Sequence, residues 1–239
     1  MGTPPRLHNP PMTPRARFLR AFNSLLPTTA HSLLSPYYSR RRSRFQADWS
    51  VKTNDSPMHR PEQYTELDKK TRLLADCVER YTGKDASVLD LCCNSGRNLV
   101  ELWNRGYRDL QGVDINANAI AFSKTYAPHI QADAKLLASP LETFFPKVAD
   151  KRFDVAISRG TSIEFIAPDF PLVREICRVT RRFCMLLLQP AALPYPRIWR
   201  YEFERQGFTL LEYSYYVHGK TNTFCFASPE AVKELELRP

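Results

Sequence analysis

The sequence from Val88 to Asn116 reads VLDLCCNSGRNLVELWNRGYRDLQGVDIN, and it predicts a strand, a tight loop, a helix and a second strand. The first strand, 87–91, is a short apolar run without alternation, which is typical of a central parallel strand covered on both faces. The chain then turns at 92–96, and the second strand runs over 109–114. This order of elements predicts a βαβ unit within a parallel sheet.

The helix between the two strands has its own start and stop signals. Leu99, Leu102 and Trp103 recur at helical spacing and predict one buried face. Ser95 is placed to cap the first turn, and Gly106 supplies the stop. The helix is therefore expected to begin directly after the loop.

One carboxylate lies near the end of each strand, and the two acids indicate what this edge of the sheet binds. A nicotinamide-binding protein would carry G-x-G-x-x-G here, but only Gly96 is present, and the charge of Asp90 would repel a pyrophosphate. The same charge attracts an ammonium or a sulfonium. S-adenosylmethionine carries both cations and no phosphate, and its ribose hydroxyls suit a carboxylate at Asp114. The alternative is that Asp90 caps the loop and Asp114 caps the next helix.

With these features the sequence resembles a class I (Rossmann-like) S-adenosylmethionine-dependent methyltransferase of the small-molecule type 11/25 kind. The first motif of that family, [D/E]-x-G-x-G-x-G, aligns with residues 90–96, and Cys92 and Asn94 stand where glycines are usual. Asn94 is expected to adopt a positive φ, which Asn tolerates better than most residues. The resemblance covers roughly residues 60 to 228. It implies an α/β fold, Rossmann-like and doubly wound, with a mostly parallel seven-stranded sheet that ends in an antiparallel hairpin.

The remaining pattern supplies the other elements of this fold. Helices are predicted at 61–81, 116–127, 170–179 and 197–206, and parallel strands at 135–138, 153–158 and 183–188. The segments 208–217 and 221–227 are predicted to pair as the hairpin. The glutamates and the final proline predict a solvated C-terminal end.

The resemblance implies a set of cofactor-binding residues, mostly at the carboxyl edge of the sheet. Leu141 is expected against the adenine ring, and Asp114 against the ribose. The full set of candidates is Arg60, Asp90, Cys92, Asn94, Gly96, Asn98, Asp114, Ile115, Ser139, Leu141 and Ser158.

Four residues are candidates for a general base or for orienting the methyl acceptor: His59, Tyr64, Arg159 and Glu164. A base is needed only if the acceptor must lose a proton early, so acceptor-side residues vary among methyltransferases. The competing interpretation is that Arg60 and Tyr64 tie the leading helix to the sheet. The scattered histidines and the absence of a C-x-x-C pair predict no metal site.

The charge of the chain is concentrated at its N-terminus. Residues 1–47 contain eight arginines and no acid, and subtracting these from the net charge of +9 leaves about +1 for the rest. We expect a basic, largely disordered tail at 1–47, a cap segment and helix at 48–84, and the S-adenosylmethionine-binding domain at 85–239.

Within the tail, 14–26 could form an amphipathic basic helix. An Arg-rich, Ser-rich and acid-free leader resembles a mitochondrial transit peptide. It could equally bind an anionic membrane surface or a nucleic acid, or be a solvated extension. The six cysteines lie mostly in apolar segments, and no apolar run approaches about 20 residues. The sequence therefore predicts a cytoplasmic protein without a transmembrane segment, with a mitochondrial location as the alternative.

The sequence thus predicts an enzyme that transfers a methyl group from S-adenosylmethionine to an O, N or C atom of a small-molecule acceptor by in-line displacement. Two alternatives remain open. The substitutions at Cys92 and Asn94 allow a catalytically silent binding domain, and the arginine tail allows a nucleic-acid methyltransferase. The second is less favoured because the Asn/Asp-Pro-Pro-Tyr signature is absent.

Overall fold

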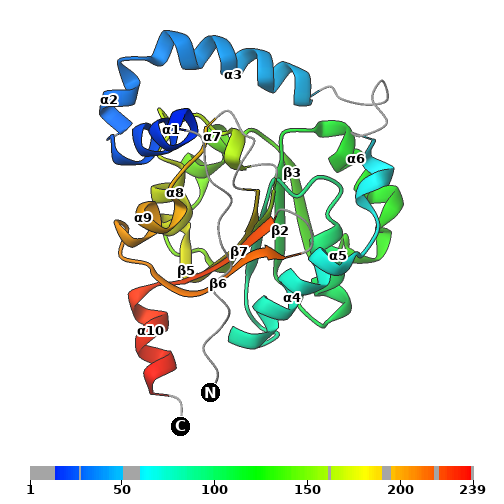
Figure 1. Ribbon diagram of the computed structural model, residues 1–239. Coiled ribbons are helices and arrows are strands. Elements are labelled where there is room, and N and C mark those ends of the chain that lie inside the picture. The colour runs from blue at the N-terminus through cyan, green and yellow to red at the C-terminus, as the bar shows by residue number, and fades with distance from the viewer. Residues whose placement is uncertain are drawn as a thin grey trace.

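A seven-stranded sheet in the order β3-β2-β1-β4-β5-β7-β6 forms the centre of the computed structural model (Figure 1). The structure describes residues 14–26, 28–50, 60–160, 163–189, 195–217 and 221–237. The strands are β1 (Val88–Leu91), β2 (Leu110–Asp114), β3 (Ala134–Ala138), β4 (Phe153–Arg159), β5 (Thr180–Leu188), β6 (Thr209–Val217) and β7 (Thr221–Ala227). Strands β1 to β5 are parallel, and β7 and β6 close the sheet as an antiparallel hairpin. The predicted fold class is confirmed.

Helices cover both faces of this sheet. One face packs against α4 (Lys69–Tyr81), α5 (Arg97–Asn104) and α10 (Pro229–Glu236), and the other against α7 (Leu141–Phe144), α8 (Leu172–Val179) and α9 (Trp199–Glu204). The side chains of β5 alternate between the two cores, with Met185 in the first and Leu186 in the second. Because both faces are covered, the central strands are apolar without alternation, as the sequence predicts. Helix α6 (Ala117–Tyr126) lies along β2 and β3.

The leading helix begins later than its sequence pattern predicts. The chain forms a short 3-10 turn, η2 (Pro61–Tyr64), and α4 starts only at Lys69. Asp68 is the reason, because its carboxylate accepts hydrogen bonds from the backbone amides of Lys70 and Thr71 and so caps the helix there.

Ser95 does not cap α5 as predicted. Gly96 is the N-cap residue, with a φ of 88° and no side-chain cap. The Ser95 hydroxyl instead donates to the carbonyl of Tyr64 at 3.2 Å. This bond ties the segment before α4 to the loop after β1.

The C-terminal end forms a helix, most of whose residues are exposed. Ser228 accepts a hydrogen bond from the backbone amide of Ala231, and Pro229 occupies the first turn of α10. Ala231 is fully buried against the sheet, so the helix is held by packing as well as by its cap.

The N-terminal segment also differs from expectation, because residues 14–50 are mostly helical. The helices are α1 (Pro14–Leu25), α2 (Thr28–Ser32) and α3 (Ser35–Ser50). Helix α1 binds the region of α9: the Asn23 amide donates to the carbonyl of Pro196 at 3.0 Å, and the Ser24 hydroxyl donates to Glu202 at 2.7 Å. Disorder was predicted from charge, but acidic and carbonyl groups far along the chain provide partners for this segment.

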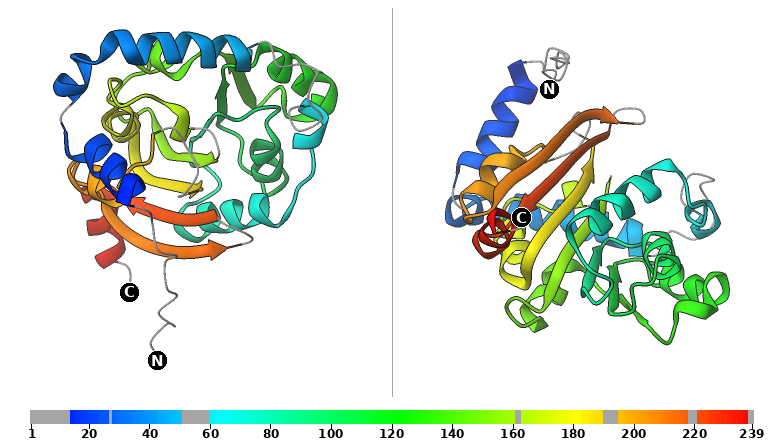
Figure 2. Two further views of the ribbon diagram at one scale, coloured as in Figure 1. Left: turned by 45° about the horizontal axis from the view of Figure 1, so that its top comes forward. Right: turned by 90° about the horizontal axis from the view of Figure 1, so that it is seen from below.

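Helix α3 passes over the edge of the sheet where the parallel strands end (Figures 1 and 2). Arg42 of α3 is ion-paired with Asp169 and with Glu142, the latter at 3.3 Å. These contacts join α3 to the segments that follow β4 and β3. The helix is therefore a roof over the carboxyl edge.

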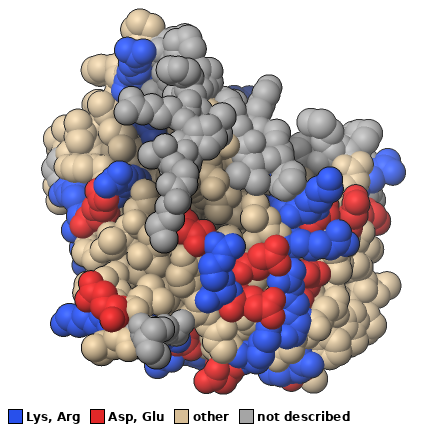
Figure 3. All heavy atoms as spheres, turned by 60° about the horizontal axis from the view of Figure 1, so that its bottom comes forward, with Lys and Arg blue, Asp and Glu red and all other residues tan. Residues whose placement is uncertain are grey.

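Positive and negative side chains are interleaved on the face shown in Figure 3. On and beside α4, Arg105 pairs with Asp76 at 2.6 Å and with Glu79 at 2.9 Å, and Arg80 pairs with Glu212 at 2.6 Å. This face is not a basic patch of the kind that tracks a nucleic-acid backbone. Among the described helices, none has the length and apolar character that crossing a bilayer requires.

Candidate active site

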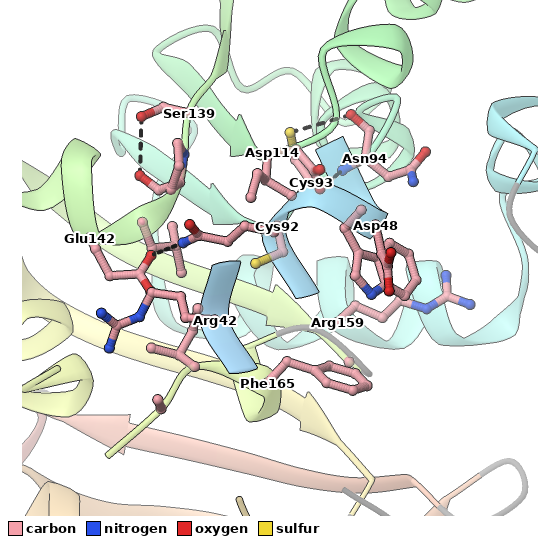
Figure 4. A pocket seen from close by; sticks show the side chains of 18 of the residues that line it. Arg42, Asp48, Cys92, Cys93, Asn94, Asp114, Ser139, Glu142, Arg159 and Phe165 are labelled. Carbon is pink, nitrogen blue, oxygen red and sulfur yellow. Dashed lines mark hydrogen bonds and ion pairs between the residues drawn. The ribbon is translucent and has the colours of Figure 1, made fainter. Parts of the chain in front are cut away.

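A cavity of about 570 Å³ lies between the carboxyl ends of β1, β2 and β4 and the underside of α3 (Figure 4). Its size falls within the range of small-molecule sites, which are usually about 300–1,000 Å³. Nine residues predicted from the sequence line it: Tyr64, Cys92, Asn94, Asn98, Asp114, Ile115, Ser139, Leu141 and Arg159. The tertiary structure therefore brings most of the predicted set to one cavity.

The loop after β1 contains three residues with positive φ: Cys92 at 59°, Asn94 at 50° and Gly96 at 88°. These are the positions at which the family motif usually has glycine. The expectation for Asn94 is confirmed. Its side-chain oxygen accepts a hydrogen bond from the backbone amide of Ser95 at 2.8 Å, which supports the turn locally. At Gly96 an added Cβ would lie 2.9 Å from Cδ2 of Leu136, so a side chain here is strained sterically as well.

We expect Asn94→Ala to lower the free energy of unfolding by about 1–2 kcal/mol, because Ala loses the local hydrogen bond and is disfavoured at positive φ. Asn94→Gly is the matched comparison. It loses the same hydrogen bond but relieves the backbone strain, so its stability should stay within about 1 kcal/mol of the parent chain. Urea unfolding measures both variants, and equal destabilisation of the two would contradict the strain argument.

Asp114 ends β2 at the cavity and is only 9% exposed. Its two carboxylate oxygens accept hydrogen bonds from the backbone amides of Asn94 and Asn116, each at 2.8 Å. Burial raises the pKa of this carboxyl group, and the amides of Asn116, Asn94 and Ile115 oppose that shift. The carboxylate is thus fixed in orientation at the cavity wall, as a hydrogen-bond acceptor for a ligand must be.

Asp90 was predicted to contact the cofactor, but it does not line the cavity. It is fully buried in β1, and its oxygens accept hydrogen bonds from the Asn98 amide at 3.2 and 3.5 Å. Burial raises the pKa of Asp90 to about 7, although the Asn98 hydrogen bond opposes the shift. Asp90 therefore acts on the cavity through Asn98, which does line it.

The four residues predicted to act on the acceptor lie in different places in the structure. Tyr64 and Arg159 line the cavity, and Arg159 also donates to Thr71 and Asp68, which joins β4 to the start of α4. Glu164 is 2% exposed, does not line the cavity, and accepts from the backbone amide of Gln189 at 2.9 Å. It supports the loop after β4. His59 lies outside the described residues.

Three predicted cofactor residues also lie away from the cavity. Arg60 is exposed at the start of η2. The Ser158 hydroxyl is buried and donates to the carbonyl of Leu91 at 2.9 Å, so it joins β4 to β1. Gly96 shapes the loop through its φ and its close approach to Leu136. Ser158 and Gly96 therefore shape the walls of the cavity, whereas Arg60 does not line it.

Arg97 is a cavity residue that sequence reasoning missed. Its guanidinium lies 5.2 Å from the ring centroid of Tyr64, and it forms no ion pair or hydrogen bond in the part of the chain that the structure describes. Burial lowers the pKa of Arg97, and the nearby charge of Arg159 adds to that shift. The signal for it was present, because a basic residue directly follows the last glycine position of the motif. A half-buried guanidinium without a carboxylate is suited to bind a ligand anion.

The two ends of the cavity differ in chemistry. Asp114, Asn94 and Ser139 lie together in Figure 4, and Phe165 and Arg159 lie away from them toward the other end. Leu141 is 3% exposed and supplies an apolar wall next to the first group. One end therefore suits a nucleoside, with a fixed acceptor for hydroxyls and an apolar wall for a base.

Residues 88–182 match a family described as a methyltransferase domain. The match covers β1 to the start of β5, which includes Asp90, the positive-φ loop and Asp114. The matched family and the structural neighbours are class I methyltransferases that use S-adenosylmethionine. No curated protein matches the chain by sequence.

Solved methyltransferase structures share the fold. The 1,6-didemethyltoxoflavin-N1-methyltransferase from Burkholderia thailandensis, with bound S-adenosylhomocysteine, aligns with a TM-score of 0.58 at 14% identity, over 81% of this chain and 89% of that chain. Magnesium protoporphyrin IX methyltransferase from Synechocystis PCC 6803, with bound S-adenosylmethionine, aligns with a TM-score of 0.54 at 14% identity, over 85% and 98% of the two chains. At these identities the likeness establishes the fold alone.

The [4+2]-cyclase SpnF has the same fold, with a TM-score of 0.55 at 13% identity, over 66% of this chain and 80% of that chain. A fold of this kind thus accommodates a chemistry other than methyl transfer. The reaction of this chain must therefore be argued from its cavity.

Proposed function

We propose that this chain transfers the methyl group of S-adenosylmethionine to an O, N or C atom of a small-molecule acceptor. The observation that carries the proposal is the roofed cavity itself. It has a fixed carboxylate at Asp114, and its lining also includes the aromatic side chains of Trp49 and Phe165. A cavity of about 570 Å³ beneath a covering helix suits two small molecules in contact better than a polymer strand.

The residues present fit the cofactor by charge and polarity. We assign the ribose hydroxyls to Asp114, the adenine to the apolar wall at Ile115 and Leu141, and the carboxylate of the methionine part to Arg97. Asn98, held by Asp90, would meet the same part of the cofactor. Asp90 places a negative charge beneath the cationic sulfonium and ammonium whenever it is ionised.

The cofactor supplies an electrophilic methyl group when it is bound. The protein's part is to align the acceptor with it and to exclude water, and alignment of this kind can be worth about 7–11 kcal/mol. Tyr64 is a poor base near neutral pH, because burial raises the pKa of its phenol despite the opposing charge of Arg97. Asp48 of α3 lines the cavity as a carboxylate. We propose it as the group that orients an acceptor proton.

Binding and turnover must be measured separately to test this function. Isothermal titration of the full-length chain with S-adenosylmethionine should show one site. Incubation with a panel of hydroxyl, amine and carbon acids should then release S-adenosylhomocysteine. Binding without any release across the panel would indicate a silent binding domain, and no binding at all would refute the proposal.

Recruitment of a nucleic acid by the N-terminal arginines is the remaining alternative. Arg42 is ion-paired with Asp169 and Glu142, which reduces the charge that α3 offers to a backbone of phosphates. A nucleic-acid acceptor would give turnover that falls steeply with added salt. Turnover on a small acceptor that falls much less steeply with salt is the result expected here.

A further inference from the structure

Three arginines of α3 line the cavity, and their ion pairing is unequal. Arg42 is neutralised by Glu142 at 3.3 Å and by Asp169. Arg41 and Arg44 form no ion pair with any described residue. Two guanidinium charges at the roof of the cavity thus have no carboxylate partner within the described protein.

Arg41 is held in place by neutral groups. It donates a hydrogen bond to the hydroxyl of Tyr37, and its guanidinium carbon lies 5.4 Å from the ring centroid of Tyr37 and 5.8 Å from that of Tyr195. Aromatic faces favour a cation nearby without removing its charge. Arg41 is therefore positioned while its charge remains available to a ligand.

Arg44 follows Arg41 by three residues, so the two side chains share one side of α3. The acids near them do not neutralise them. Asp48 lies one turn beyond Arg44 and pairs with neither arginine in the described structure, and Glu142 is engaged by Arg42 and by the Gln46 amide, the latter at 3.4 Å. The geometry leaves a site for a doubly hydrogen-bonded anion between two guanidinium groups.

The charge of the rest of the cavity favours the same conclusion. Arg97 and Arg159 also line it, and bound S-adenosylmethionine adds a sulfonium and an ammonium. Three acids line the cavity as well, but Asp114 is assigned to the ribose and Glu142 is paired with Arg42, which leaves Asp48 as the acid a cationic acceptor could meet. The apolar surface beside α3 comes from Phe165 and Trp49, whose ring centroids lie 6.3 Å apart.

We propose that the methyl acceptor carries an oxyanion, either a carboxylate or a phosphate group, which Arg41 and Arg44 bind, while its apolar body packs against Phe165 and Trp49. This inference rests on the proposed methyl transfer and names the chemical class of its acceptor. It also gives α3 a role in choosing the acceptor, beyond covering the cofactor.

The test compares charged and neutral probes of one shape. The full-length chain is first titrated with S-adenosylhomocysteine, which tests the cofactor site by itself. The loaded protein is then titrated with benzoate, phenyl phosphate and benzamide. We expect one or both anions to bind more tightly than benzamide, and the preferred anion distinguishes a carboxylate from a phosphate acceptor.

Substitutions on α3 then assign the preference to the two arginines. Arg41→Gln and Arg44→Gln should each weaken binding of the preferred anion by about tenfold, while the affinities for benzamide and S-adenosylhomocysteine stay unchanged. Arg40→Gln is the matched control, because Arg40 is exposed on the same helix, does not line the cavity and carries the same charge. It should change anion binding by less than about twofold.

Two results would overturn the inference while leaving the methyl-transfer proposal standing. One is normal S-adenosylhomocysteine binding with no preference for either anion over benzamide. The other is an equal loss in Arg40→Gln, which would indicate a general charge effect, such as attraction to a nucleic-acid backbone. Failure to bind S-adenosylhomocysteine would instead refute the proposed function itself.

Discussion

Replacing Asp114 by Ala should weaken S-adenosylmethionine binding by roughly 100-fold, or about 3 kcal/mol, because hydrogen bonds to a charged acceptor are worth about 1.5–3 kcal/mol each. The carboxylate is almost buried and held by the amides of Asn94 and Asn116. It therefore loses little conformational entropy when it binds the ribose. Isothermal titration of the variant gives the dissociation constant directly.

The same substitution also removes the acceptor for two backbone amides and can loosen the loop. Asp114→Asn helps to separate the two effects, because its one amide oxygen can still accept from one of the two backbone amides while the negative charge is gone. It should lose less stability than Asp114→Ala and still lose most of the affinity. Asp109→Ala, at an exposed acid just before the same strand, is the control and should bind normally. Normal binding by Asp114→Ala would disprove the proposed ribose contact.

Asp90 should contribute a loss of stability to the ligand-free protein as the pH rises from about 4 to about 7, which carboxyl groups with lowered pKa values, such as Asp68 and Asp154, oppose at the acid end. Burial raises the pKa of Asp90 in the folded chain to about 7, whereas an unfolded chain releases that proton near pH 4. The folded state therefore binds the extra proton across this window, and its loss lowers the free energy of unfolding by up to about 4 kcal/mol. Denaturant unfolding between pH 4 and pH 8 measures this slope.

Asp90→Asn isolates the contribution of this one group. It keeps the shape and an oxygen that can accept from Asn98, but it has no charge to bury. The variant should match the parent chain near pH 4 and be more stable than it at pH 8. A parent and variant that differ equally at both pH values would exclude a titrating Asp90.

Ligand binding should show the opposite dependence on pH. A cationic cofactor favours the ionised form of Asp90, so S-adenosylmethionine should bind more tightly as the pH rises through about 7 and should release a proton on binding. Asp90→Asn should lose this pH dependence. The buried charge of Asp90 thus destabilises the ligand-free protein at neutral pH and favours the binding of a cation.

Much of the fold was predictable from the chain alone. The central strands are apolar without alternation because both faces are covered, and the observed bounds of β1, β2 and β4 agree with the predicted ones within a residue. The turn conformation was predictable at Asn94, whose positive φ follows from its place in the motif. These features were predictable because they follow from residues that are close together in the sequence.

Features that depend on contacts between distant segments were not predicted correctly from local sequence patterns. Asp68 starts α4 late and is itself held by Arg159, and Ser95 bonds to Tyr64 instead of capping α5. Asp90 looked like a cofactor contact because it ends a strand, but depth in the sheet separates it from the cavity. Burial is a property of the packed molecule, so spacing could not reveal it.

By itself, the sequence determined a class I methyltransferase fold and one acid, Asp114, at the ligand edge of its sheet. Only the tertiary structure decided that the arginine-rich segment near the N-terminus is a roof over that edge. Charge composition predicts a solvated tail, because it counts cations without their partners. The partners, Glu142 and Asp169, lie about 100 residues away or more along the chain, and folding alone brings them within reach of Arg42.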